Sequence, residues 1–514
     1  MLNWNNSSIF ATLVALIIIA PVFAIFYSAF LGDTSLWPHL FSTVLPRYIS
    51  NTIILMVGVG ILSSILGVST AWVVTRYDFF GKNFFEWALL LPAAVPAYII
   101  AYTYTDFLEY AGPVQKIIRE FFNFQNADQY WFPEIRSMEG AIFVMSFVLY
   151  PYIYMTTRAS FLTVPISFFQ TSLIYGRSSF FSVALPLARP GIIAGLALVL
   201  METVSDFGTV EYFALETLTL GVFNVWLGMN SLSGASQISS VLFVFVVVLL
   251  TIEYLARRNQ RFHEKSSGQN MLESKETSNF KKLVCFTVCT IPIVIGFVVP
   301  VSILLNFVFS GFSIIDFTQI FYTSFFSITL ALVGAFFVML ASIFLILISQ
   351  YKSNNFQKSL IFLASCGYAL PGTILAVGMV IFLGWINKYL HLHLSYVAGG
   401  FIVLIFAYVV RFLAVGNASI RSGILKIHPN AMDASLTMGA GFYRGVKVVI
   451  MPLILSNILI GGILVFVDIL KELPITLLLR PFNFETLATY VYQYASDELL
   501  QESSFAALII VVVG

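Results

Sequence analysis

Residues 9–31 read IFATLVALIIIAPVFAIFYSAFL, a run that contains no charged side chain. A helix of about 20 such residues crosses the roughly 30 Å hydrocarbon core of a bilayer. Comparable apolar runs begin near Thr52, Trp87, Gly140, Ile192, Ile238, Leu283, Ser324, Leu360, Val397, Ile454 and Ser504. The sequence therefore predicts an all-α polytopic membrane protein of about twelve transmembrane helices. We expect the twelfth to be incomplete and the native chain to continue, because the sequence stops at Gly514 before this last run can cross.

The composition excludes several classes of protein. Hydrophobic residues make up 59% of the chain and charged residues 10%, which is outside the range of soluble globular proteins. The net charge of +1 gives no electrostatic basis for binding nucleic acid. No Lys or Arg precedes the first apolar run, so we expect a retained helix and not a cleaved signal peptide. Cys285, Cys289 and Cys366 lie in apolar stretches and are predicted to be small packing residues.

The basic residues indicate the topology. With a cytoplasmic N-terminus, 19 of the 26 Lys and Arg residues lie inside, among them Arg158 and Arg411, six lie outside, and Lys471 lies within a span. Positively charged loops are retained on the cytoplasmic face. We therefore predict a cytoplasmic N-terminus.

The chain contains an internal repeat. Glu216-Thr217-Leu218 recurs as Glu485-Thr486-Leu487, and Leu185-Pro186-Leu187 recurs as Met451-Pro452-Leu453, at nearly constant offset. The polar, lysine-rich stretch 257–282 is typical of a cytoplasmic linker. We predict a first repeat of six spans in residues 1–256 and a second in residues 283–514. Because six is an even number, both repeats enter the membrane in the same orientation.

Two long predicted cytoplasmic loops, about residues 158–190 and 411–452, carry a further duplicated pattern. The first contains Gln170-Thr171-Ser172 and Gly176, and the second contains His428-Pro429, Asp433-Ala434-Ser435 and Gly439; a Pro-Leu pair follows in each. Both resemble the Glu-Ala-Ala (EAA) loop of ABC importer permeases, a short surface helix that ends near the glycine and fits a groove on a soluble ATPase. A plain basic connection would explain one such loop, but the duplication favours a pair of coupling loops. The first loop lacks the acidic residue and is three residues shorter between Gly and Pro, which predicts weaker or asymmetric coupling there.

The resemblance covers nearly the whole chain. Residues 201–210 (METVSDFGTV), 471–476 (KELPIT) and 478–484 (LLRPFNF) are similar to the fused iron(III) permeases. This resemblance implies the type I ABC importer permease fold in the cytoplasmic (inner) membrane, with two parallel six-helix repeats. It also implies an extracytoplasmic iron-binding protein and two copies of an ABC ATPase subunit that hold ATP and Mg, so that this chain has no cofactor and no enzymatic activity of its own. Transport would follow ATP-driven alternating access.

Four carboxylates are predicted to lie within spans. Glu202 and Asp206 stand at i and i+4, as do Asp468 and Glu472 at the equivalent places of the second repeat, so each pair is expected to share a helix face. Acids inside a membrane usually face a cavity, a partner or a pathway, and a hard cation prefers oxygen ligands. One interpretation is a translocation path with transient Fe(III) contacts at these residues. The other is structural: Lys471 or Arg480 neutralises the second pair, or all four merely cap or solvate helix ends.

Other functions and features leave alternatives open. A permease for thiamine or another small cation shares the duplicated loop, and an ion-coupled secondary transporter would use intramembrane acids but has no need of the loops. The five histidines are scattered, which disfavours an intramembrane enzyme, and His391 and His393 are better explained as loop residues than as metal ligands. The outer loop of residues 110–139 is predicted either to dock the binding protein or to serve surface packing.

Overall fold

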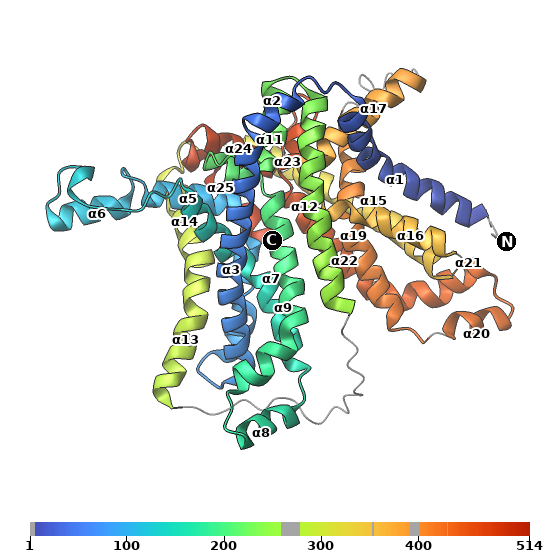
Figure 1. Ribbon diagram of the computed structural model, residues 1–514, viewed down its shortest axis with the longest axis horizontal. Coiled ribbons are helices and arrows are strands. Elements are labelled where there is room, and N and C mark those ends of the chain that lie inside the picture. Colours follow the sequence, from blue (N-terminus) through green and yellow to red (C-terminus); the bar gives the residue numbers. More distant parts are fainter. Residues whose placement is uncertain (1–5, 259–277, 352–353, 391–399, 429) are drawn as a thin grey trace. The chain divides into compact units, whose positions relative to one another are not determined.

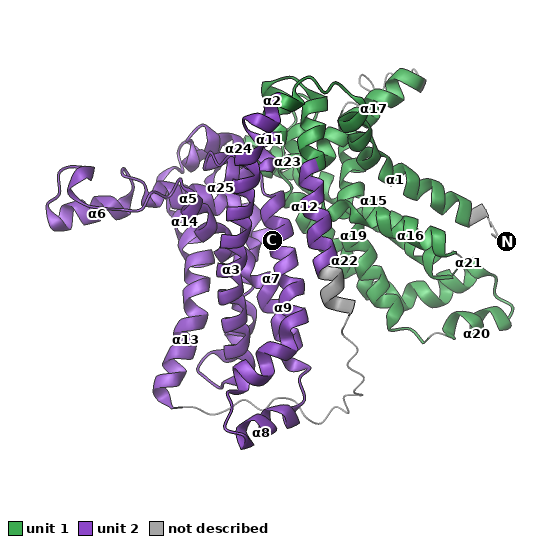
Figure 2. Cartoon of the chain, viewed as in Figure 1, with its two compact units in different colours: residues 1–38, 222–240, 317–490 green, residues 39–221, 241–316, 491–514 purple. Residues whose placement is uncertain are grey.

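The computed structural model describes residues 6–258, 278–351, 354–390, 400–428 and 430–514 (Figure 1). Most of the predicted linker, and also His391, His393 and Pro429, lie outside the described residues. The described chain is built from helices joined by turns and forms two compact units, shown in different colours in Figure 2. Unit 1 comprises residues 1–38, 222–240 and 317–490, and unit 2 comprises residues 39–221, 241–316 and 491–514. The prediction of an all-α membrane protein is confirmed.

The helices divide between the units as follows. Unit 2 contains α3 (Leu45–Arg76), α4 (Lys82–Ala88), η1 (Leu91–Ala94), α5 (Ala97–Leu108), α6 (Pro113–Phe122), η2 (Ala127–Gln129), α7 (Met138–Leu162), α8 (Ile166–Ile174), η3 (Phe180–Ala184), α9 (Leu185–Ser205), α10 (Gly208–Tyr212), α13 (Asn279–Ile293), η5 (Val294–Val298), α14 (Val299–Ser310) and α25 (Leu500–Val513). Unit 1 contains α1 (Asn6–Leu31), η4 (Asn224–Gly228), α15 (Phe317–Tyr351), α16 (Asn355–Ala364), η6 (Ser365–Ala369), α17 (Gly372–Leu390), α19 (Phe401–Leu425), α20 (Ala431–Thr437), α21 (Phe442–Gly445), η7 (Val446–Ile450), α22 (Met451–Lys471) and α23 (Pro474–Leu479). The unit boundaries fall within α2 (Trp37–Ser42), α11 (Leu218–Phe223), α12 (Leu232–Arg258) and α24 (Leu487–Ser496).

Ten of the described helices are long and apolar enough to cross a membrane, and an eleventh span results if one bent pair of helices counts as a span. The span expected from Trp87 is this pair, in which residues 82–94 and 97–122 meet at 86°. Val95 has extended backbone (φ −93°, ψ 118°) because it precedes Pro96, and proline disfavours the helical conformation in the residue before it. The span expected from Ser504 is the 14-residue α25, which is shorter than the others.

The compact units do not follow the two predicted repeats. The first helix of the chain, α1, packs on α16 and α17 of the second repeat, where Gln357 Nε2 donates to Ser8 O (3.3 Å) and Thr12 Oγ1 (3.2 Å). In the same way α13 and α14, the first helices of the second repeat, pack on α3 and α5 of the first, and Tyr104 Oη donates to Ile295 O (2.6 Å). Each unit therefore combines the central helices of one repeat with the leading helix of the other.

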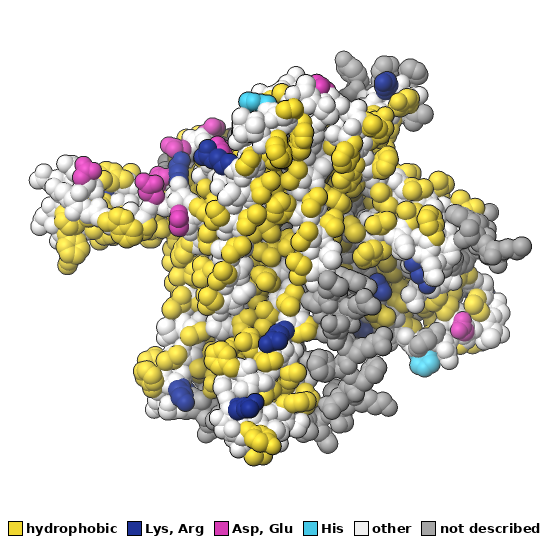
Figure 3. All heavy atoms as spheres, in the orientation of Figure 1, with side chains coloured by type: hydrophobic (Ala, Val, Ile, Leu, Met, Phe, Trp, Pro, Cys, Tyr) yellow, Lys and Arg dark blue, Asp and Glu magenta, His cyan; other side chains and the backbone are white. Residues whose placement is uncertain are grey.

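The two units share a packing pattern. In unit 2 the long helices α3, α7 and α9 contact one another, and in unit 1 α15, α19 and α22 do the same. The unit 2 core includes Tyr150, Tyr154 and the free thiols Cys285 and Cys289, which confirms that these two cysteines are packing residues. Apolar side chains of α3 and α22 that are exposed in the structure face outward, as expected for surfaces that contact lipid, and Figure 3 shows how widely such side chains cover the visible face.

Candidate functional site

The first predicted coupling sequence forms a short helix with a glycine cap. In α8, Gln170 and Thr171 are exposed and Ser172 is buried. The helix ends in a Schellman motif, because Arg177 N donates to Ser172 O (2.9 Å) and Gly176 N donates to Leu173 O (3.1 Å). Gly176 has φ +62°, a conformation that glycine adopts without steric cost. The glycine therefore ends the helix at a defined residue.

The second predicted coupling sequence forms the same structure in the other unit. In α20, Asp433 and Ala434 are exposed and Ser435 is buried. The cap is matched bond for bond: Ala440 N donates to Ser435 O (3.1 Å), Gly439 N donates to Leu436 O (3.0 Å), and Gly439 has φ +86°. The buried hydroxyl groups also agree, since Ser172 and Ser435 each donate to the carbonyl oxygen three residues earlier at 2.8 Å.

The anchors of the two helices differ. Phe169 holds α8 against α3, where its ring lies 6.2 Å from that of Trp72 and the Arg76 guanidinium lies 5.7 Å from its centroid. At the equivalent place in α20, Met432 is buried in a cluster with residues of α19, α22 and η7. The three-residue length difference between the loops is explained by α21, a helical turn that only the second loop has before its π-helical turn.

The acid pair of unit 2 lies at a break between helices. Helix α9 ends at Ser205, and Asp206 has extended backbone (ψ 130°), so Glu202 and Asp206 do not share one continuous helix as predicted. Asp206 instead caps α10: its carboxylate accepts from Thr209 N (2.9 Å), Thr209 Oγ1 (3.2 Å) and Val210 N (3.3 Å). The Glu202 and Asp206 charges are close enough to interact. The capping role predicted as the alternative is therefore present at Asp206.

The acid pair of unit 1 lies at the matching break. Helix α22 ends at Lys471, Glu472 is extended (ψ 116°), and its Oε1 accepts from Ile475 N (3.1 Å) at the start of α23. Its Oε2 lies 3.4 Å from Arg411 Nε, and the two side chains are only 6% and 9% exposed. Asp468 lies close enough to Lys471 for their charges to interact. Both acids of this pair are thus near basic side chains.

The partner of Glu472 corrects two sequence-based interpretations. Arg411 was counted among the cytoplasmic loop residues, but it lies buried within the candidate span Phe401–Leu425. Arg480 was proposed as a partner of Asp468 or Glu472. It pairs instead with Glu485 (3.5 Å) and donates to Phe484 O (3.3 Å). A Cβ atom at position 372 would lie 2.6 Å from Arg411 Nη1 and 2.8 Å from Glu472 Oε1, so the pair is packed directly against Gly372.

The repeated Glu-Thr-Leu tripeptide has the same structural role in both units. Leu218 N donates to Thr52 Oγ1 of α3 (3.0 Å), and Leu487 N donates to Ser327 Oγ of α15 (2.7 Å). The glutamates each pair with an arginine: Glu216 with Arg47 at 2.8 Å, and Glu485 with Arg480 at 3.5 Å. The tripeptide therefore links the chain that follows each helix break, after α9 and after α22, by a hydrogen bond to a long helix of the same unit, α3 or α15.

Unit 2 also contains a cluster of tyrosines and a carboxylate that sequence analysis missed. The Tyr102 and Tyr212 rings lie 4.4 Å apart, and Tyr492 shares a side-chain hydrogen bond with Glu211. The Tyr102 hydroxyl is buried and has no hydrogen-bond partner among the described residues. These residues come from α5, α10 and α24, so no spacing in the sequence could have associated them. Among the described residues, no group of three His, Cys, Asp or Glu side chains is placed to hold a metal ion.

Comparison with known proteins supports the predicted resemblance. The chain is 24% identical over 481 residues to the Fe(3+)-transport system permease protein FbpB 2 of Haemophilus influenzae, covering 92% of this chain and 89% of that protein. It is 21% identical to the ferric transport system permease protein FbpB of Actinobacillus pleuropneumoniae, covering 97% and 75%. No family model matches the chain.

Shorter permeases match only part of the chain. The sulfate transport system permease protein CysT of Synechococcus elongatus is 28% identical and covers 51% of this chain and 93% of its own length. The molybdenum transport system permease protein ModB of Haemophilus influenzae is 26% identical over 38% of this chain and 86% of its own length. Similarity over nearly the whole of this chain to the ferric permeases, together with partial similarity to shorter permeases, is the pattern expected of a duplicated protein.

Proposed function

We propose that this chain is a duplicated permease of an ABC importer and that it provides the path by which ferric iron crosses the cytoplasmic membrane. The main support is the matched pair of helices α8 and α20. Their caps agree bond for bond although they lie 263 residues apart in the sequence, with Gly176 matching Gly439. The ferric cargo is inferred from the relatives that match nearly the whole chain.

In this proposal each short helix binds one of two ATPase subunits, which hold the ATP and Mg. Support comes from the exposed apolar residues beside each cap: Leu173 and Tyr175 on α8, and Leu436 and Met438 at the equivalent places of α20. Four exposed apolar side chains next to two rigid caps suit insertion into a groove on a soluble partner. Closure of the ATPases on ATP would then move α9 and α22, which follow the two loops, and drive alternating access.

The cargo would meet oxygen ligands along its path. Glu202 and Asp468 stay candidates for transient Fe(III) contacts, whereas the bonds of Asp206 and Glu472 favour a structural role for these two acids. We add Glu211, Tyr102 and Tyr492, because phenol and carboxylate oxygens are the hard donors that a highly charged cation prefers. An extracytoplasmic binding protein would deliver the iron, on the side opposite the cytoplasmic N-terminus.

The test changes the exposed apolar residues and leaves the buried ones intact. A Tyr175→Asp, Met438→Asp double variant should insert normally yet lose binding of the ATPase subunit and iron uptake in cells that also carry the binding protein. Phe80→Asp is the matched control, since Phe80 is a similarly exposed aromatic residue in the turn between α3 and α4, outside both loops. Undiminished ATPase binding by the double variant would refute the coupling assignment and favour an ion-coupled transporter.

A second measurement separates the cargo from the class of transporter. If the wild type binds its ATPase but moves no iron, the permease assignment stands and thiamine or another small cation becomes the cargo to test. If Glu202→Gln and Asp468→Asn together leave iron uptake unchanged, these acids are not part of the path.

A further inference from the structure

The segment between α5 and α7 forms an arm that extends away from the long helices of unit 2 (Figure 1). It consists of α6, the turn η2 and the chain up to Ser137. The arm emerges near the end of the long helices opposite to α8, the predicted cytoplasmic helix (Figure 1). It is therefore expected at the outer surface of the membrane.

Helix α6 has one apolar and one polar face. At 100° per residue, Val114, Ile117, Ile118, Phe121 and Phe122 fall on one side. The remaining residues after the first proline, Gln115, Lys116, Arg119 and Glu120, fall on the other side. So clean a division predicts that the two faces meet different surroundings.

Two residues of the polar face, Gln115 and Arg119, contact the protein, while Lys116 and Glu120 are exposed. Gln115 is only 8% exposed; its Nε2 donates to Leu108 O (2.8 Å) and its Oε1 accepts from Tyr130 Oη (2.6 Å). Arg119 donates to Tyr110 O (2.7 Å) and Tyr130 Oη (3.0 Å), and its guanidinium lies 4.1 Å from the centroid of the Tyr110 ring. These contacts fix the orientation of α6 through its hydrophilic side.

Most of the apolar face is left uncovered, although Val114 and Ile118 are partly buried. Phe121 is 78% exposed, Ile117 and Phe122 are more than half exposed, and Trp131 in the following segment is 86% exposed. An amphipathic helix on a water-soluble surface buries its apolar face against the protein and turns its polar face to water. The reverse arrangement in α6 indicates that the outer side of the helix meets an apolar surface.

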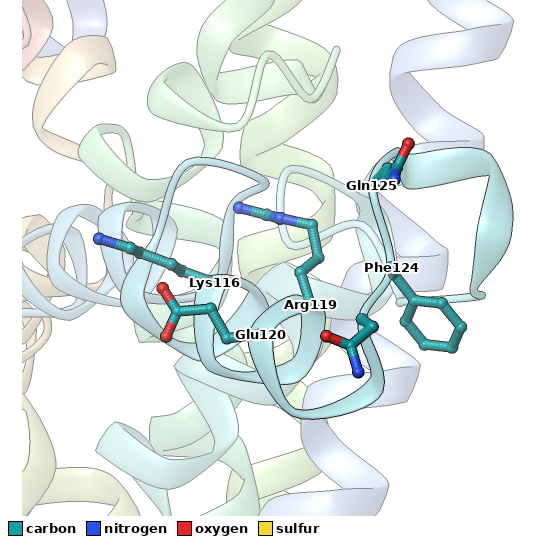
Figure 4. Close-up of a pocket in the computed structure, with 6 residues that line it drawn as sticks. Lys116, Arg119, Glu120, Phe124 and Gln125 are labelled. Atoms are coloured by element: carbon teal, nitrogen blue, oxygen red, sulfur yellow. The ribbon is translucent and has the colours of Figure 1, made fainter.

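We propose that α6 lies in the interfacial layer of the outer leaflet, with its apolar face inserted among the lipid acyl chains. In Figure 3 the hydrophobic side chains of the arm gather on its lower side, which is the side on which the long helices of unit 2 extend. Acidic side chains of the arm lie on its upper side. Phe and Trp side chains beside basic residues are typical of helices that lie in the plane of a membrane surface. A shallow pocket lined by Lys116, Arg119, Glu120, Asn123, Phe124 and Gln125 lies along the polar edge (Figure 4), where lipid headgroups would meet the helix.

The orientation of α6 can be measured directly with spin labels in the full-length protein. In a background with Cys285, Cys289 and Cys366 replaced by Ala, nitroxides would be attached at Phe121→Cys and, as matched control on the polar face, at Glu120→Cys. In nanodiscs of phosphatidylcholine and phosphatidylglycerol we expect the 121 label to be reached by oxygen and shielded from a water-soluble nickel chelate, and the 120 label to show the opposite preference. Ile117→Cys provides a second apolar position should the 121 variant fold poorly.

Two results would overturn the proposal. Equal access of the nickel chelate to labels 120 and 121 would place the arm in water. A 121 label that becomes shielded only when the extracytoplasmic binding protein is added would assign the apolar face to that protein and not to lipid. Neither result depends on the identity of the cargo, so the proposal can fail independently of the proposed transport function.

Discussion

The ion pair between Arg411 and Glu472 provides the sharpest quantitative prediction. Two unit charges 3.4 Å apart attract by about 5 kcal/mol at an effective dielectric constant of about 20. Much of this attraction offsets the desolvation of two nearly buried groups, so the pair itself contributes little net stability. Removing one partner is different, because it leaves the other charge buried without compensation, at a cost of about 3–5 kcal/mol.

The perturbation is a double-mutant cycle. Glu472→Gln removes the charge but keeps a side-chain oxygen that can accept from Ile475 N, and Arg411→Met removes the guanidinium while filling similar volume. At roughly 2–4 °C per kcal/mol for a unit of this size, each single change should lower the midpoint of thermal unfolding by about 6–20 °C. The double variant should recover most of that loss.

The assay is thermal unfolding of the purified protein in detergent, with iron uptake measured in parallel. Gly372→Ala gives an independent check, since its Cβ would press on both charged groups, and it should destabilise the wild type more than the double variant. Additive losses in the double variant would show that Arg411 and Glu472 are not energetically coupled. Unchanged unfolding of Glu472→Gln together with lost iron uptake would return Glu472 to the cargo path.

Three further predictions concern the glycine cap of α20, the repeated Glu-Thr-Leu tripeptide and the tyrosine cluster. Gly439→Val should weaken ATPase-subunit binding by roughly 5- to 30-fold, since a left-handed backbone costs about 1–2 kcal/mol for a residue that carries a side chain. Gly439→Asn, the control, should bind nearly as well as the wild type. Equal binding of both variants would show that the cap is not needed. Thr52→Val should cost about 1–3 kcal/mol of stability, because it leaves the buried Leu218 N–H without an acceptor, and an unchanged unfolding midpoint would contradict this role. Glu211→Gln combined with Tyr492→Phe should lower the rate of iron uptake without lowering the unfolding midpoint; loss of stability with normal uptake would make the cluster structural.

Much of the site could be predicted because it depends on local sequence. Gly176 and Gly439 end helices through their own backbone freedom, so two glycines at matched positions were sufficient to locate both caps. The helix breaks at Asp206 and Glu472 could not be located in this way. An i, i+4 spacing in an apolar run is compatible with a continuous helix, and the break is fixed by bonds that each acid forms to the chain beyond it.

Errors arose where a residue's environment depends on a distant partner. The count of positive charges placed Arg411 in a loop, because a single charge is expensive inside a membrane. Its partner Glu472 stands 61 residues further along the chain and makes burial tolerable. Likewise, the bend after Trp87 follows from Pro96, but hydropathy alone does not distinguish a bent pair of helices from one straight span.

The amino-acid sequence is sufficient to predict that the chain spans a membrane, that it contains a repeat and that two glycine-capped helices recur. Each of these properties is local, because apolar length, repeat spacing and backbone preference act within a short stretch of chain. Other features become visible only in the folded protein: α1 packs with the second repeat and α13 and α14 with the first, Arg411 compensates Glu472, and α6 turns its apolar face outward. These depend on contacts between segments that are distant in sequence, and an apolar helix carries no mark of which neighbour will cover it.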